Sequence, residues 1–253
     1  MSYQPLGYLS AKRILWAIFL LTVLLTGVLA LSIPVRTVSA AGAITVDRTD
    51  DPPVTAAGVG AAGCTAAAND CSLRGAVLVA NASAGTTIHI PAGTYNLTVD
   101  GNSEGGNCGD TTIGDLDIAG NGTIMVGAGA SSTIINQTMP NDRVICVDQN
   151  LVGNFTFSLS NVTISGGRET HGVGGGGILS GAPGDVTNVT NVIFSNNQAS
   201  GSGSPVGGGL GNGDGTLNIT GSTFSANQAV GSGGGVYFSG VQKRAAGVVT
   251  ESF

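Results

Sequence analysis

A repeat of thirty residues between positions 155 and 240 constrains the fold of this chain more than any other feature. Three segments align without gaps: Leu159-Ser-Asn-Val-Thr-Ile164, Val189-Thr-Asn-Val-Ile-Phe194 and Ile219-Thr-Gly-Ser-Thr-Phe224. Apolar residues alternate with polar ones around each segment, which is typical of a strand with one buried face. Gly-Gly-apolar units separate the segments, at 176–178, 208–210 and 234–236. Strand cores of fixed length with Gly/Ser-rich spacers of variable length predict the coils of a solenoid.

The repeat predicts an all-β fold, a right-handed parallel β-helix over residues 86–240. Equivalent residues of stacked coils lie about 4.8 Å apart in a parallel sheet, so Ile164, Phe194 and Phe224 are expected to form one internal stack. Glycines suit the corners, where a positive φ or a close backbone approach is needed. A disordered Gly/Ser linker is the alternative for such a composition, and the apolar columns argue against it.

Composition narrows the classes of function. The chain has 43 glycines in 253 residues, 9% charged residues and 42% hydrophobic residues, which is not the composition of a disordered protein. The net charge is −6 and no Lys/Arg cluster follows the N-terminal region. Because binding to phosphates needs a basic surface, a nucleic-acid partner is not expected.

Residues 1–40 have the layout of an export signal. Lys12 and Arg13 precede an uncharged apolar run over 14–33, and Val38-Ser-Ala40 supplies small residues for a cleavage site. The layout favours cleavage after Ala40, although a run of about 20 residues is also long enough for an uncleaved membrane anchor. Both alternatives place the rest of the chain outside the cytosol, secreted or at the cell surface. Membrane contact is expected only through this segment.

Four cysteines follow the signal: Cys64, Cys71, Cys108 and Cys146. An even number in an exported chain indicates disulfides. Three pairings are possible, and the short loop favours Cys64 with Cys71, which leaves Cys108 with Cys146. Zinc binding is the competing interpretation, but no Cys-x-x-Cys pair is present and His89 and His171 are far apart in the sequence. We expect neither a metal nor another cofactor.

Residues 41–85 read as a linker followed by a cysteine-containing N-terminal cap. Ser72 is a suitable N-cap for a short helix, and one apolar face is formed by Leu73, Ala76, Val77 and Ala80. A strand, a turn and a second strand are expected over 87–99. Further strands are expected at 115–118, 123–126, 133–135 and 143–147. Residues 241–253 continue neither apolar column, so they are expected to form an atypical tail, as in an incomplete chain.

Several motifs together resemble the CSLREA-domain proteins, which are exported bacterial and archaeal proteins. The motifs are Cys71-Ser-Leu-Arg74, Ile88-His-Ile-Pro-Ala-Gly-Thr-Tyr95, Gly114-Asp-Leu-Asp-Ile118, Asp142-Arg-Val144 and Gly175-Gly-Gly-Ile178. The resemblance implies a right-handed parallel β-helix and no common activity. Where the family has Glu, this chain has Gly75, which removes half of a capping box and weakens the helix. The repeats are also similar to the GGA[ILV] and FxxN repeats of chlamydial polymorphic outer-membrane proteins, which are surface adhesins.

The charged residues give little support for catalysis. Cleavage of a glycosidic bond usually needs two acidic residues at a defined separation. Within residues 155–240 the charged residues are Arg168, Glu169, Asp185 and Asp214, all in spacers that share no column. A denser group is formed by Asp115, Asp117, Asp142 and Arg143, with Glu104 and Asp110 in the preceding loop. Asp115 and Asp117 alternate with apolar residues, so both are expected on one solvent-facing side of a strand.

The sequence therefore predicts a non-catalytic secreted or cell-surface module with no catalytic residue. Its role would be adhesion, or binding of a glycan or a partner surface, through a flat face of hydroxyl and amide side chains. The expected exposed positions are Thr156, Ser158, Thr163, Asn188, Thr190, Asn218, Thr220 and Thr223. The alternative function is a carbohydrate-active β-helix enzyme, a polysaccharide lyase or hydrolase. The sequence does not predict an oligomeric state.

Overall fold

The computed structural model describes residues 42–53, 64, 68–101, 108–147 and 154–239, together with the backbone of 242–246 and 250–252. The chain has two units, Met1–Ser39 and Ala40–Phe253, and the described residues all belong to the second. The predicted export signal or anchor lies outside the described residues. Within the part of the chain that is described, no helix has the length and apolar character needed to span a bilayer.

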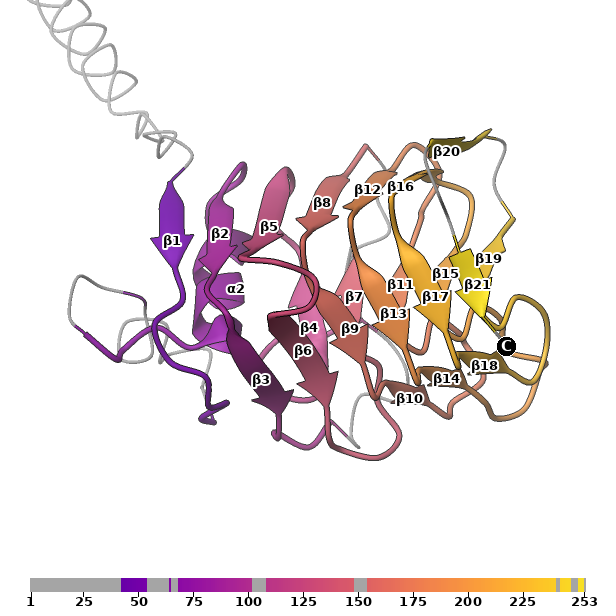
Figure 1. The fold of residues 1–253 in the computed structure, drawn as a ribbon, viewed down its shortest axis with the longest axis horizontal. Helices are drawn as coiled ribbons and strands as arrows, with labels where there is room; N and C mark the ends of the chain where they lie inside the picture. Colours follow the sequence, from indigo (N-terminus) through magenta and orange to yellow (C-terminus); the bar gives the residue numbers. More distant parts are fainter. Residues whose placement is uncertain are drawn as a thin grey trace, which may run out of the picture. The chain divides into compact units, whose positions relative to one another are not determined.

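The described part of the second unit is a parallel β-solenoid with one short helix before its coils, as predicted (Figure 1). Each coil contributes a strand to sheet A, then to sheet B, then to sheet C, and the later coils add a short strand to sheet D between B and C. Neighbouring strands within each sheet are parallel. The chain therefore winds through the same corners in every coil, and the apolar residues point into one continuous core.

The strands of the four sheets are as follows. Sheet A holds β1 (Ala43–Thr45), β2 (Thr87–Ile90), β5 (Thr123–Gly127), β8 (Thr156–Ser160), β12 (Val186–Thr190), β16 (Thr216–Thr220) and β20 (Gln242–Ala246). Sheet B holds β3 (Gly93–Leu97), β6 (Thr133–Gln137), β9 (Thr163–Ser165), β13 (Ile193–Ser195), β17 (Thr223–Ser225) and β21 (Thr250–Ser252). Sheet C holds β4 (Leu116–Ile118), β7 (Ile145–Val147), β11 (Ile178–Ser180), β15 (Leu210–Asn212) and β19 (Val236–Phe238). Sheet D holds β10 (Arg168–Glu169), β14 (Gln198–Ala199) and β18 (Gln228–Ala229).

The register of the strands reproduces the thirty-residue repeat. Phe194 pairs with Ile164 on one side and with Phe224 on the other. All three side chains are buried, and the two phenylalanine rings stack with centroids 4.6 Å apart and planes 2° from parallel. The predicted internal stack is confirmed. Because each ring is covered by the coils beside it, the stack ties neighbouring coils together.

Asparagines shape the corner between sheets B and D. Asn197 is fully buried; its Nδ2 donates to the carbonyl of Ile164 (3.0 Å) and its Oδ1 accepts from the backbone N–H of Gly167 (3.0 Å). Asn227 repeats the first contact one coil later, because its Nδ2 donates to the carbonyl of Phe194 (3.0 Å). The two amides are also joined, since Asn197 Nδ2 donates to Asn227 Oδ1 (3.0 Å). This ladder explains why an asparagine lies three residues after the stacked phenylalanine in both coils.

The helix α2 (Leu73–Asn81) packs against β2 and β4 through the predicted apolar face, whose four residues are buried. Ser72 is its N-cap, and its Oγ accepts from the N–H of Gly75 at 3.1 Å. Gly75 has no side chain to return the bond, so only one half of a capping box is present.

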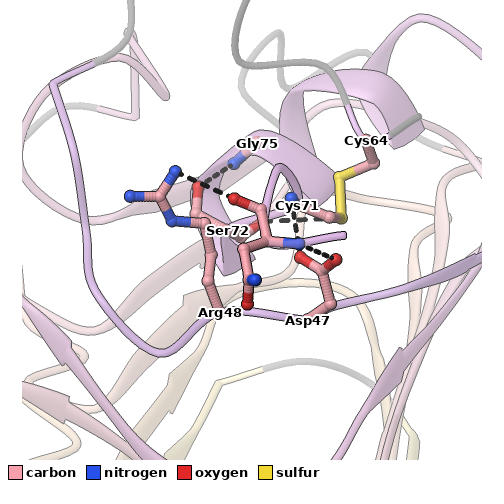
Figure 2. Close-up of a disulfide and its surroundings, with 7 residues drawn as sticks. Asp47, Arg48, Cys64, Cys71, Ser72 and Gly75 are labelled. Carbon is pink, nitrogen blue, oxygen red and sulfur yellow. Dashed lines mark hydrogen bonds between the residues drawn. A yellow bond between two sulfur atoms is a disulfide. The ribbon is translucent and has the colours of Figure 1, made fainter. Parts of the chain in front are cut away.

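The segment after β1 fastens the start of this helix. The two carboxylate oxygens of Asp47 accept from the backbone N–H groups of Asn69 (2.6 Å) and Cys71 (2.8 Å). Figure 2 shows Asp47 beside the disulfide that joins Cys64 to Cys71. The second disulfide joins Cys108 to Cys146. Both pairings are the ones that the cysteine spacing favours.

The strands β20 and β21 were not expected from the sequence pattern. Residues 241–253 do not continue the apolar columns, yet the backbone of β20 pairs with β16 and that of β21 pairs with β17. Parallel pairing uses backbone groups alone, so a strand can extend a sheet without repeating the side-chain pattern.

Candidate functional site

A buried arginine organises the side of the solenoid on which the acidic residues lie. Arg74 is completely buried and forms a two-pronged ion pair with Asp51, with Nε–Oδ1 and Nη2–Oδ2 distances of 2.7 and 2.9 Å. The same guanidinium donates to the carbonyls of Thr111 (2.9 Å), Gly114 (2.7 Å) and Asp115 (3.1 Å). One side chain of the helix therefore holds the segment that leads into β4.

Asp115, Asp117 and Asp142 are buried, with exposed fractions of 1%, 0% and 8%. The prediction that Asp115 and Asp117 face solvent is therefore wrong. In β4, Asp117 pairs with Cys146 of β7, and Cys146 is bonded to Cys108 in the segment before β4. The backbone N–H groups of Gly109 and Asp110, next to Cys108, bond to Asp117, so both faces of β4 are covered. Arg143 is buried beside them, with its Nη1 3.6 Å from Asp115 Oδ2 and 3.3 Å from Cys146 Sγ.

Burial makes these carboxyl groups unusually weak acids. It raises the pKa of Asp142 to about 7 and that of Asp117 to about 6. The backbone N–H groups of Gly109 and Asp110 oppose the increase at Asp117. Burial, together with the neighbouring Asp117 carboxylate, raises the pKa of Asp115 well above its ordinary value. The cluster can therefore bind and release protons near neutral pH.

The cysteines of this cluster also lie at a spacing suitable for a metal. The sulfur atoms of Cys108 and Cys146 and a carboxylate oxygen of Asp117 lie within 4.8 Å of one another. Both sulfurs are in the disulfide, and a disulfide is not the thiolate that zinc requires. His89 lies on β2 and His171 follows β10, so neither histidine shares an element with the cysteines.

The buried acidic residues of the repeat accept hydrogen bonds from backbone N–H groups. Glu169 accepts from the N–H groups of His171 (2.6 Å) and Gly174 (2.9 Å). Asp185 accepts from those of Phe155 (3.0 Å) and Ala182 (2.9 Å). Asp110 and Asp214 are exposed, and Glu104 lies outside the described residues.

A polar groove of about 180 Å³ lies along sheet D, where sequence reasoning did not place a site. It is lined by Arg168, Asn196, Asn197, Gln198, Ala226 and Gln228. Arg168 of β10, Gln198 of β14 and Gln228 of β18 are paired in register across the three strands. The thirty-residue interval that joins Arg168 to Gln198 and Gln228 was a signal for this row, but the sequence does not show that sheet D exists.

The outer face of sheet A carries a second polar row. Asn188 Nδ2 donates to Ser158 Oγ (3.1 Å), and Asn218 Nδ2 donates to Asn188 Oδ1 (2.8 Å). Of the eight positions predicted to be exposed, Thr190 and Thr220 are exposed and the other six are half-buried. Side chains in one row cover their neighbours in the next coil, which reduces their exposure.

Comparisons with protein-family models, with curated proteins and with solved structures each found no match to this chain. The resemblance to the CSLREA-domain proteins therefore rests on the motifs named above and on the parallel β-solenoid that they imply.

Proposed function

We propose that the protein is a non-catalytic, exported binding module that holds a neutral glycan on the outer face of sheet A. The observation that carries the proposal is the hydrogen-bonded row of Ser158, Asn188 and Asn218. Each amide in such a row keeps further donor or acceptor capacity, and sugar hydroxyls can use both.

The charge on this face supports a neutral ligand. None of the described outward-facing residues of β8, β12 and β16 is ionisable. Rows of hydroxyl and amide groups repeat at the strand spacing of about 4.8 Å, so a chain of sugars can make many similar hydrogen bonds. Each bond contributes only about 1 kcal/mol, so affinity comes from their number.

Three features support a module that acts outside the cytosol and does not cleave its ligand. The predicted export segment and the two disulfides are typical of an oxidising compartment. The acidic residues able to act as acid or base near neutral pH are buried. The motifs that resemble the CSLREA-domain proteins support export.

The test is binding of cellotetraose, measured by calorimetry, to the purified protein and to two double variants. N188A/N218A removes amides from the sheet A row and should weaken binding about tenfold or more. N96A/N136A is the matched control, because it removes a similar amide pair, joined by a 3.0 Å hydrogen bond, from sheet B. Equal affinities of all three proteins, or release of reducing sugars by the parent, would contradict the proposal.

A further inference from the structure

The groove along sheet D presents one cation beside two amides in a fixed row. Arg168, Gln198 and Gln228 face outward from adjacent parallel strands, while their chain neighbours Glu169 and Ala199 are buried. Parallel pairing places such side chains about 4.8 Å apart along the axis of the solenoid. The groove is therefore linear, with the guanidinium at the end formed by β10.

The rest of the groove is fixed by the corner between sheets B and D. Asn196 and Ala226 line it with backbone in the left-handed region, at φ 56° and 53°. The Asn197 side chain, beneath them, is already engaged in the asparagine ladder. The backbone of this corner therefore shapes the groove, and the polar lining side chains outside the asparagine ladder are those of Arg168, Asn196, Gln198 and Gln228.

Arg168 differs from the other described arginines in having no ion pair with a described carboxylate. Arg48, Arg74 and Arg143 each pair with an aspartate, at 2.5, 2.7 and 3.6 Å. In the described part of the chain, no carboxylate lies within 4.0 Å of the Arg168 guanidinium, and the residue is exposed. A guanidinium on a groove is suited to a two-pronged bond with a carboxylate.

We propose that this groove binds an acidic oligosaccharide, with the carboxylate of a uronic acid on Arg168 and sugar hydroxyls on Gln198 and Gln228. A glutamine amide offers a donor and an acceptor, which matches adjacent hydroxyl groups of a sugar. The inference rests on the proposed function only in that the ligand is a glycan, because the groove and the sheet A row lie on different sheets.

The experiment compares two probes that differ only at C6: cellotetraose and its C6-oxidised form, a tetraglucuronate. Calorimetry at low salt should show that the groove binds the tetraglucuronate more tightly than cellotetraose, with a dissociation constant at least about tenfold lower. R168Q should remove that preference, and Q198A/Q228A should weaken binding of both probes at this site. R48Q is the matched control; it also removes one surface arginine, and it should leave the preference unchanged. Unaltered thermal midpoints will show that the variants are folded.

The outcomes separate this inference from the proposed function. If N188A/N218A weakens cellotetraose binding but leaves tetraglucuronate binding intact, both proposals are supported. If the parent shows no preference for the tetraglucuronate, or if R168Q keeps it, the groove is not an acidic-sugar site, whatever the result at sheet A. An equal loss in R48Q and R168Q would also overturn it, because general charge attraction would then explain the preference.

Discussion

The substitution Arg74→Met should destabilise the protein strongly, because this arginine joins three segments beneath the surface. Its guanidinium pairs with Asp51 and donates to carbonyls of residues 111–115. Asp51 in turn accepts from the backbone N–H groups of Thr98 (2.9 Å) and Val99 (3.2 Å). Methionine retains most of the length of the side chain but none of its donors.

The expected loss follows from what remains after the change. Asp51 is 8% exposed and Arg74 0%, so R74M leaves a buried carboxylate without its counter-ion. Breaking a buried pair in this way typically costs 3–5 kcal/mol. We expect R74M to lower the free energy of unfolding by about 3–5 kcal/mol. R74M/D51N should be less destabilised than R74M, because it leaves no buried charge unpaired. The asparagine oxygen can still accept from the backbone N–H groups of Thr98 and Val99.

Arg48 provides a matched control within the same chain. It pairs with Asp50 through two bonds, but the side chains are 32% and 61% exposed. An exposed pair contributes less than about 1 kcal/mol, so R48M should change stability by no more than that. Urea unfolding with the disulfides intact, monitored by circular dichroism, measures all four proteins. If R74M is no less stable than R48M, the buried network does not anchor the start of the solenoid.

Three further predictions concern other contacts. Burial raises the pKa of Asp142 to about 7, so the folded protein keeps a proton that the unfolded protein has released. The free energy of unfolding should therefore fall as pH rises from about 4 to 7. D142N should lessen this fall and should be more stable than the parent at pH 8, by roughly 2–4 kcal/mol in urea titrations. A pH profile of D142N equal to that of the parent would contradict this role of Asp142. N197A should lower the free energy of unfolding by about 2–4 kcal/mol, because two buried backbone groups lose their partner. The control N196G, at a position with positive φ, should change it by no more than about 0.5 kcal/mol. Equal effects of the two substitutions in thermal melts would disprove the role of the asparagine ladder. C108A/C146A opens a loop of 38 residues and should lower stability by about 3–4 kcal/mol, and a midpoint equal to that of the oxidised parent would refute this.

The strands of the repeat were predictable because their period appears directly in the sequence. Columns of alternating apolar residues thirty positions apart led to the stacking of Ile164, Phe194 and Phe224, which the register confirms. The corner contacts were less accessible. Asn197 reaches a carbonyl 33 positions earlier, and no local pattern shows that an amide will satisfy that group. The shared Asn-Gln-Ala motif marks the position, but its purpose depends on the distance between coils.

The groove along sheet D was missed for a related reason. Its three strands have two residues each, too short for a visible alternation. Gln198 and Gln228 share a residue type and the Asn-Gln-Ala motif, but Arg168 does not match them, so sequence similarity does not extend the row to Arg168. Their common register becomes visible only when the longer strands before them have fixed the coils.

The burial of Asp115 and Asp117 shows where alternation alone misleads. A strand of alternating residues indicates two faces, and polar residues on one face normally indicate solvent. Alternation does not say whether another segment covers that face. Here Asp117 lies beside Cys146 in the sheet, and the bond from Cys146 to Cys108 brings residues before β4 across it. Cys146 lies in a strand predicted over 143–147, and its favoured partner Cys108 lies in the loop just upstream of Asp115. This pairing was therefore a signal that the face with the aspartates would be covered and that its carboxyl groups would become weak acids.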